Sequence, residues 1–277
     1  MIYQRFVPEG WKQEVNSMTL DEAKKYKEKG EILEGYVNKC DDNGNLFLNL
    51  GKEIYGFLPY GEVEAFKVEE NGLPKLQMCK NKVNKIVQFK IKDINNNIVI
   101  LSRKDVEKEV LKWLKIKKEN NDILSGIVRS IQPYGAFIEI AGGVVGLIHI
   151  EDISVSRIKN PSERFEIGQK VNIVIKSIEN NTNKIYLSHK ELLGTWDENI
   201  KEIKKGQILK GIVKDRAKNN KGIFIEIKPN LVGMAEYSDK YNYGDKVNIF
   251  VKKIIPEKKK IKLTIVGGSN NGWRQSN

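Results

Sequence analysis

Few side chains in this sequence are of a type that performs covalent or acid–base chemistry. The 277 residues include two histidines, His149 and His189, and two cysteines, Cys40 and Cys79, and none of them is grouped at the spacing of a metal site. No glycine-rich loop is followed by Lys and Ser or Thr, as a nucleotide-binding loop would require. We therefore expect a protein that is not an enzyme, with no metal, no cofactor and no small-molecule substrate.

Positive charge is the second chemical feature, and it is unevenly distributed. Lys and Arg number 48 against 36 Asp and Glu, which gives a formal net charge of +12. Residues 201–266 alone hold 17 basic and 7 acidic residues, or +10 of that total. A surplus of this size favours a polyanionic partner, either nucleic acid or an anionic membrane surface.

Two features of the sequence argue against a membrane. No run of about 18 apolar residues occurs, and the first residues lack the apolar stretch of a signal peptide. The lysines of residues 201–266 alternate along expected strands, whereas a membrane-surface helix would place them opposite an apolar face. We expect a cytoplasmic protein with a nucleic acid partner and no membrane contact.

The elements that must position these groups come from a threefold internal repeat. One phrase, with Ile-Leu followed by x-Gly-x-Val, occurs at residues 30–37, 121–128 and 206–213. Each copy precedes a glycine-led run of alternating apolar residues and then three further β-rich runs, the fourth strand of the first repeat beginning at Lys82. Alternation with a period of two is typical of half-buried strands, and five short strands per repeat fit a small closed barrel.

The expected fold class is therefore all-β, with three tandem five-stranded barrels of the OB-fold type joined by short helical connectors. Apolar residues at helical spacing predict the connectors, and Thr19 with Glu22 predicts a capping box. The predicted divisions are an N-terminal helical segment (1–29), barrel 1 (30–103), a helical linker (104–120), barrel 2 (121–190), a helical linker (191–203), barrel 3 (204–266) and a flexible tail (267–277).

Barrel 2 resembles the S1 RNA-binding domain, an OB-fold family. The motifs that carry the resemblance are Gly126-x-Val128, Tyr134-Gly-Ala-Phe137, Gly146-Leu-Ile-His149, Gly168-Gln-Lys-Val171 and Ile185-Tyr-Leu-Ser188. The resemblance extends over about residues 30–266 and is weakest in the first repeat. In arrangement the chain is similar to shortened ribosomal proteins of the S1 type, in which several such domains hold messenger RNA near the small ribosomal subunit.

The resemblance also implies a site. In S1 domains, nucleic acid lies across one barrel face and contacts two aromatic residues, a histidine, and an acidic and a basic residue around the last turn. The aromatic, histidine and basic positions fall on Tyr134, Phe137, His149 and Lys184, and the acidic position on either Glu179 or Asn180. Each aromatic ring can stack a base at roughly 1 to 3 kcal/mol without reading its identity, which favours unpaired strands.

Barrels 2 and 3 offer different groups. Residues 121–190 hold 8 basic and 7 acidic residues, so we expect barrel 2 to supply stacking. In barrel 3 the aromatic pair is reduced to Lys221 and Phe224, and Glu236 replaces the histidine. We expect barrel 3 to attract phosphates, with Phe224 as a further contact. Its candidate basic residues are Lys210, Lys214, Arg216, Lys218 and Lys221.

Barrel 1 is expected to bind RNA poorly. Residues 30–103 hold 10 basic and 10 acidic residues, and Asn43, Leu46 and Pro59 occupy the three binding positions. In ribosomal proteins of the S1 type, leading domains with similarly altered faces contact proteins. The resemblance therefore implies that barrel 1 docks on the small ribosomal subunit or another protein, and a purely architectural role is the alternative.

The function expected from these features is binding of single-stranded messenger RNA in translation. One alternative is an adaptor that recruits RNA to a decay or transcription complex. The other is a protein-interaction scaffold that does not bind RNA. Salt dependence separates the scaffold from the RNA binders, because phosphate contacts weaken as salt rises.

Overall fold

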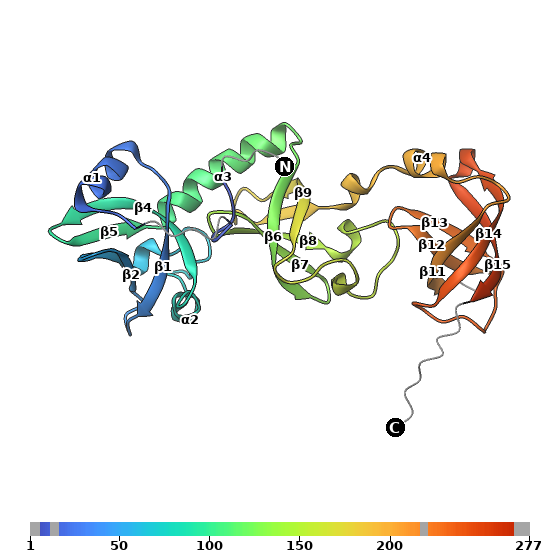
Figure 1. Cartoon of the computed structure of the whole chain (residues 1–277), viewed down its shortest axis with the longest axis horizontal. Helices are drawn as coiled ribbons and strands as arrows, with labels where there is room; N and C mark the ends of the chain where they lie inside the picture. The colour runs from blue at the N-terminus through green and yellow to red at the C-terminus, as the bar shows by residue number, and fades with distance from the viewer. Residues whose placement is uncertain (1–5, 12–16, 217–220, 269–277) are drawn as a thin grey trace, which may run out of the picture. The chain divides into compact units, whose positions relative to one another are not determined.

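Three closed five-stranded barrels make up the computed structural model of the chain (Figure 1). The structure describes residues 6–11, 17–216 and 221–268. The all-β fold class predicted from the repeats is confirmed. The tail residues 269–277 lie outside the described part.

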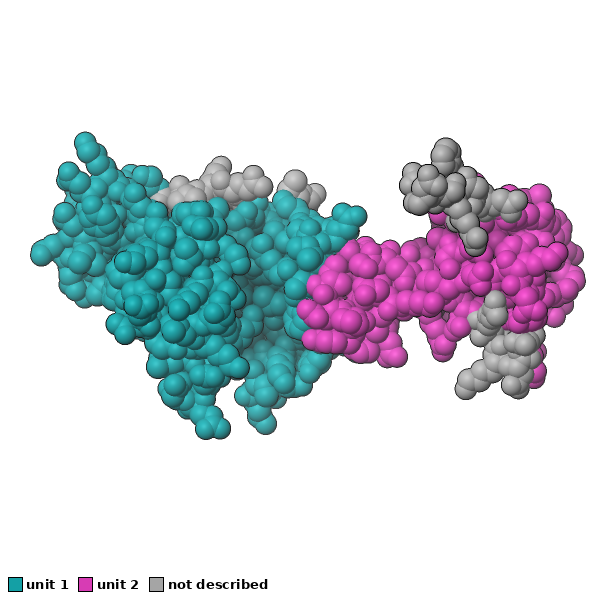
Figure 2. All heavy atoms as spheres, turned by 90° about the horizontal axis from the view of Figure 1, so that it is seen from below, with its two compact units in different colours: residues 1–130, 137–147, 166–187 teal, residues 131–136, 148–165, 188–277 magenta. Residues whose placement is uncertain are grey.

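The chain divides into two compact units, which Figure 2 colours separately. Barrel 1 belongs to the first unit, barrel 3 belongs to the second, and barrel 2 contributes residues to both. Unit 1 comprises residues 1–130, 137–147 and 166–187, and unit 2 comprises residues 131–136, 148–165 and 188–277.

The strands of barrel 1 follow the order β1-β2-β3-β5-β4, in which β3 and β5 are parallel. Closure in this order leaves no free strand edge. Residues 82–85 form a turn in which Asn84 has a φ of 63°, so the fourth strand begins at Ile86 and the predicted start at Lys82 is wrong. The strands are β1 (Leu33–Cys40), β2 (Leu46–Gly51), β3 (Ile54–Leu58), β4 (Ile86–Asn95) and β5 (Ile98–Ser102).

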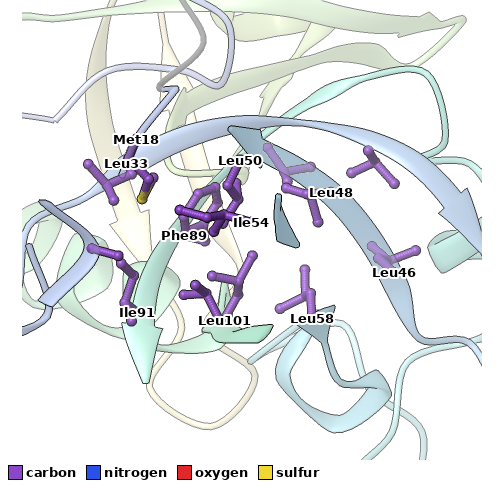
Figure 3. Close-up of a cluster of buried hydrophobic side chains, with 14 of the residues drawn as sticks. Met18, Leu33, Leu46, Leu48, Leu50, Ile54, Leu58, Phe89, Ile91 and Leu101 are labelled. Carbon is purple, nitrogen blue, oxygen red and sulfur yellow. The ribbon is translucent and has the colours of Figure 1, made fainter. Parts of the chain in front are cut away.

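Every strand of barrel 1 contributes to one apolar core. Figure 3 shows side chains of the five strands pointing towards one another, among them Leu33, Leu48, Leu58, Phe89 and Leu101. All five are at most 3% exposed. Full burial of one such side chain contributes about 1.5 to 3 kcal/mol, so this core supplies the main driving force for closing the barrel.

Barrels 2 and 3 are closed in the same manner, with the orders β10-β8-β7-β6-β9 and β11-β12-β13-β15-β14. Their strands are β6 (Leu124–Gln132), β7 (Gly135–Ala141), β8 (Val144–His149), β9 (Lys170–Ile178), β10 (Ile185–Ser188), β11 (Ile208–Arg216), β12 (Ile223–Lys228), β13 (Leu231–Ala235), β14 (Lys246–Ile255) and β15 (Lys260–Gly268).

The glycine that follows Ile-Leu in the repeated phrase has a packing role in barrels 2 and 3. A Cβ atom at Gly126 would lie 2.5 Å from Cγ2 of Ile138, and one at Gly211 would lie 2.5 Å from Cγ2 of Ile225. No real Cβ approaches a neighbour so closely. The phrase therefore recurs because the first strand of each barrel passes directly against a core side chain of the second.

The helices outside the barrels agree only in part with the helices predicted from the sequence. Helix α1 (Leu20–Lys29) has the predicted capping box, in which the Thr19 hydroxyl accepts from the Glu22 N–H. Helix α2 (Leu76–Lys80) lies before β4, and helix α3 (Lys104–Glu119) is continuous.

The second connector forms three short turns instead of one helix. They are a 3-10 turn at Lys190–Leu193, helix α4 (Trp196–Asn199) and a 3-10 turn at Ile200–Glu202. Gly194, with a φ of 77°, separates the first turn from α4, and Thr195 caps α4 by accepting from the Glu198 N–H. A left-handed glycine followed by a capping threonine ends one turn and starts another.

Within unit 1, residues 6–11 cross from barrel 1 to barrel 2. The Glu9 carboxylate accepts from the Gln88 N–H on β4 at 3.0 Å, and the Glu9 N–H donates to Glu139 Oε1 on β7 at 2.6 Å. The ring of Phe6 packs edge-on against Trp113 of α3, with 5.3 Å between centroids. This segment therefore ties both barrels and α3 together.

Arg103 is the centre of this connection. It is 1% exposed, and its guanidinium donates to Glu9 at 2.7 Å and to the Val63 carbonyl at 3.0 Å. The carboxylates of Glu64 and Glu107 also pair with it. A buried cation of this kind is tolerated because every side of it meets an acceptor.

Candidate nucleic-acid interface

The two aromatic residues of barrel 2 are placed differently. Tyr134 lies in the turn before β7, and 50% of its surface is exposed. Phe137 is half-buried on β7, between the buried side chains of Ala136 and Ile138. Since successive side chains of a strand face opposite sides, Phe137 points away from the core that its two neighbours enter.

His149 lies at the end of β8, the strand next to β7. The Ile150 N–H donates to the Tyr134 carbonyl at 2.9 Å, which joins the end of β8 to the turn that carries the tyrosine. The His149 side chain is 46% exposed, and its Nδ1 lies 3.9 Å from the Glu151 carboxylate. An exposed phenol ring and an exposed imidazole therefore lie on adjoining segments of unit 2.

The turn between β9 and β10 carries Lys184 and the acid that the sequence left ambiguous. Lys184 is exposed, and its N–H donates to Thr182 Oγ1 at 3.3 Å. Glu179 accepts from the hydroxyls of Thr182 and Tyr186, and these hydrogen bonds lower the pKa of its carboxyl. The hydrogen bonds of the turn therefore favour the charged form of Glu179, whereas the other candidate, Asn180, is an uncharged amide.

Barrel 3 presents one row of cross-strand neighbours whose pairing is fully defined. Phe224 on β12 lies opposite Met234 on β13, Met234 is paired with Lys262 on β15, and Lys262 lies opposite Lys253 on β14. Phe224 and Met234 are each 38% exposed. The row therefore combines an aromatic ring, a thioether and two ammonium groups on one outward face.

The predicted basic residues of barrel 3 do not all reach solvent. Lys221 is exposed just before β12, and Lys210 is exposed on β11, where it lines a hollow of about 440 Å³. Arg216 is the last residue of β11, and Lys218 lies outside the described residues. Two of the five predicted basic residues, Lys210 and Lys221, are thus exposed lysines.

Lys214 does not fit the prediction of a phosphate contact. It is 5% exposed, its Nζ donates to Glu163 Oε2 at 2.9 Å, and Glu226 is 3.6 Å away. Tyr243 covers it, with 5.3 Å from Nζ to the ring centroid. This lysine is itself buried and pairs with a carboxylate of the β8–β9 loop, Glu163, and with one of barrel 3, Glu226, so its charge is not available to a ligand.

In barrel 1, Phe47 and not Leu46 holds the outward position of the second strand. Leu46 is fully buried, whereas Phe47 is 36% exposed. Phe47 lies opposite Phe57, as Phe224 lies opposite Met234 in barrel 3. The prediction that placed Leu46 at this position is wrong by one residue, because Phe47 follows Gly44 by three residues whereas Phe224 follows Gly222 by two.

The rest of this row differs between the two barrels. In barrel 1, Phe57 is paired with Ile100, and Ile100 lies opposite Asp93. Barrel 3 has lysines at both of these positions. The rings of Phe47 and Phe57 are 5.5 Å apart. Barrel 1 therefore has an aromatic face without the cations that accompany it in barrel 3.

Comparison with known proteins agrees with this geometry. A family model described as the S1 RNA binding domain matches residues 117–190. Barrel 2 therefore belongs to the S1 RNA-binding domain family, as its motifs predicted.

Two similar proteins match most of the chain, including parts outside barrel 2. The small ribosomal subunit protein bS1 of Staphylococcus aureus is 33% identical over 251 residues, which cover 85% of this chain and 61% of that protein. The bS1 homolog of Bacillus cereus is 35% identical over 243 residues, covering 80% and 60%. The chain thus spans about three fifths of the length of these relatives.

The described part of the chain offers little for other kinds of site. It contains no group of three or more His, Cys, Asp or Glu side chains placed to hold a metal ion. No helix among the described residues is long and apolar enough to cross a membrane.

Proposed function

We propose that the chain binds single-stranded RNA through the outward faces of barrels 2 and 3. The observation that carries this proposal is the placement of Tyr134 and His149. Their side chains are 50% and 46% exposed, and they lie on adjoining segments of the barrel that matches the S1 RNA binding domain. The exposed rings of Tyr134 and His149 are flat surfaces on which unpaired bases can stack.

Each residue of barrel 2 has a separate task in this proposal. Tyr134 and Phe137 stack on bases at roughly 1 to 3 kcal/mol each, and His149 stacks or donates a hydrogen bond. Lys184, exposed beside the ordered Glu179 turn, attracts a phosphate. None of these contacts depends on the identity of a base, so barrel 2 is expected to tolerate many sequences.

Barrel 3 adds a second contact of mixed character. Phe224 and Met234 provide an apolar surface for a base, and Lys221 and Lys210 attract phosphates. Barrel 3 therefore combines phosphate attraction with an exposed aromatic ring, Phe224, as the sequence led us to expect.

We further propose that the chain acts in translation, in the cytoplasm, as a non-enzymatic partner of the small ribosomal subunit. Support comes from its similarity to proteins named small ribosomal subunit protein bS1. Barrel 1 is the part proposed to contact protein. Its aromatic face lacks lysines at the positions where barrel 3 has two, which disfavours a phosphate backbone there.

The proposal is tested by fluorescence anisotropy with a labelled U-rich RNA strand at low and moderate salt. Tyr134→Ala and Phe137→Ala are each expected to weaken binding about tenfold or more, as loss of one stacked base predicts. The matched control is Tyr55→Ala, because Tyr55 is also an exposed tyrosine, 59% exposed, but lies on barrel 1.

The outcomes separate the alternatives. If the wild-type chain does not bind RNA at any salt concentration, a protein scaffold is the better description. If it binds but Tyr134→Ala and Phe137→Ala bind as tightly as Tyr55→Ala, the face of barrel 2 is not the site.

A further inference from the structure

Strands β14 and β15, residues 246–268, form a lysine hairpin, and none of its lysines is among the site residues predicted from the sequence. It holds 7 lysines and one acidic residue, Glu257, so it carries +6 of the formal net charge of +12. All seven lysines are exposed. They are Lys246, Lys252, Lys253, Lys258, Lys259, Lys260 and Lys262.

The positive charge of the hairpin is poorly compensated. Lys252 lies 3.6 Å from Glu236, and Lys259 lies 3.1 Å from Asp197, and all four side chains are at least 60% exposed. Among the described residues, no ion pair is found for the other lysines of the hairpin's closed end, which are Lys253, Lys258, Lys260 and Lys262.

The pairing of the two strands adds to the repulsion. Lys253 and Lys262 lie directly opposite each other. Like charges at opposed positions of an antiparallel pair are destabilising. A bound polyanion would relieve this repulsion, because it places negative charge over both ammonium groups.

The chemistry of the hairpin differs from that of the stacking faces. Lysine contacts the phosphate backbone and carries no information about base or pairing state. Stacking on Phe224 needs an unpaired base, whereas phosphates are equally accessible on paired strands. Lys262 is paired with Met234, so the lysines of the hairpin lie next to the apolar surface formed by Phe224 and Met234.

We propose that the lysine hairpin is a phosphate-backbone site that accepts double-stranded RNA as well as single-stranded RNA. The chain then holds a paired region on barrel 3 while barrel 2 holds an unpaired strand. This inference rests on the proposed function in that RNA is the ligand. It adds the lysines of β14 and β15, two of which share a row with Phe224 and Met234, and a different form of RNA.

The test uses the full chain and two triple variants that each remove three positive charges. Lys253→Gln/Lys260→Gln/Lys262→Gln changes the hairpin, and Lys112→Gln/Lys115→Gln/Lys118→Gln changes three exposed lysines of α3 as the control. Circular dichroism checks that both variants fold. Anisotropy is measured against a blunt RNA duplex and a U-rich single strand of equal length, across a range of salt concentrations.

We expect the wild-type chain to bind the duplex and the hairpin variant to bind it at least about tenfold more weakly. The slope of log K against log salt should become less steep by about 0.9 for each lost duplex contact. The α3 control should keep the wild-type slope.

Absence of duplex binding by the wild type, or equal losses in the two triple variants, would overturn the inference. The single-strand probe separates this result from failure of the proposed function. Single-strand binding that depends on Tyr134 and Phe137, without duplex binding, would leave the proposed function in place. Duplex binding that depends on the hairpin, without any effect of the two aromatic residues, would leave only the hairpin.

Discussion

Glu107, in helix α3, is 2% exposed, and its carboxylate accepts from the Arg103 guanidinium and the Ala65 N–H. Burial, together with the neighbouring Glu64 carboxylate, raises the pKa of Glu107 to about 8 against the opposing effect of Arg103. Against the effect of burial, Arg103 and Lys82 lower the pKa of Glu64 to about 2. At neutral pH the cluster therefore holds a protonated Glu107 beside a charged Glu64.

This arrangement predicts that unit 1 loses stability as pH rises from 5 to 8. The folded chain keeps a proton on Glu107 in this range, whereas an unfolded glutamate has lost it. The free energy of unfolding should therefore fall by up to about 1.4 kcal/mol per pH unit. Glu107→Gln cannot lose this proton, so its urea midpoint should fall less over the same range.

The control is Glu119→Gln on the same helix, because Glu119 is exposed. It should keep the pH dependence of the wild type. A slope of the same sign remains in Glu107→Gln, since burial and the nearby Glu9 also raise the pKa of Glu139. Equal slopes in both variants would contradict a protonated Glu107.

The resemblance to S1 domains supplied the residues of the candidate site in barrel 2 but not their surroundings. Tyr134 and His149 were predicted because the S1 motifs assign them, and both are exposed. Lys214 was misread, since its partner Glu163 is 51 positions away in the sequence and only the tertiary fold brings them together. Phe47 was missed because a turn one residue longer exchanges the buried and outward positions of β2.

At the scale of elements, the loop between β8 and β9 is attached to barrel 3 by charged contacts. Glu163 accepts from the Tyr243 hydroxyl at 2.6 Å and from Lys214, and against the effect of burial these hydrogen bonds lower its pKa to about 2. Arg164 pairs with Glu226 in the same region. The loop and barrel 3 are therefore expected to unfold together.

Tyr243→Phe should weaken this attachment. It removes the hydrogen bond that the hydroxyl donates to the partly exposed Glu163 carboxylate and the one that it accepts from the Lys159 N–H, so a loss of about 1 kcal/mol is expected. Urea denaturation measures it, with Tyr55→Phe as the control, because Tyr55 is 59% exposed on barrel 1. Identical midpoints for the two variants would show that the tyrosine hydroxyl does not hold the loop.

The elements themselves were largely predictable, since alternating apolar residues mark half-buried strands in all three repeats. The second connector was not. Its apolar residues have helical spacing, but Gly194 adopts a φ of 77° and Thr195 starts a new turn. The local backbone preference of two residues overrode the apolar spacing there.

At the scale of the whole molecule, Arg103 joins parts of unit 1 that are distant in the sequence. Its guanidinium reaches Glu9 in the N-terminal segment, the Val63 carbonyl of barrel 1 and Glu107 of α3. Glu9 in turn donates its N–H to Glu139 of barrel 2. Only the pair of Arg103 and Glu107, four residues apart, has a local spacing, and the other contacts join residues that are distant along the chain.

Arg103→Ala is therefore expected to destabilise unit 1 as a whole. Removal of the cation leaves the buried carboxylates of Glu9 and Glu64 without their main partner, which costs about 3 to 5 kcal/mol. The control is Arg157→Ala, since the Arg157 side chain is 82% exposed in its ion pair with Asp215 and such pairs contribute at most about 1 kcal/mol.

Hydrogen exchange distinguishes a cluster that stabilises one unit from one that stabilises the whole chain. Arg103→Ala should speed exchange in β4, α3 and β7, which contribute partners to the cluster or its neighbours, and leave β11 to β15 of barrel 3 unchanged. Faster exchange in all three barrels would mean that the units unfold as one body. If exchange in Arg103→Ala matches that in Arg157→Ala, the buried cluster is not what holds unit 1 together, and the contacts of Phe6 and Trp113 would have to provide the connection.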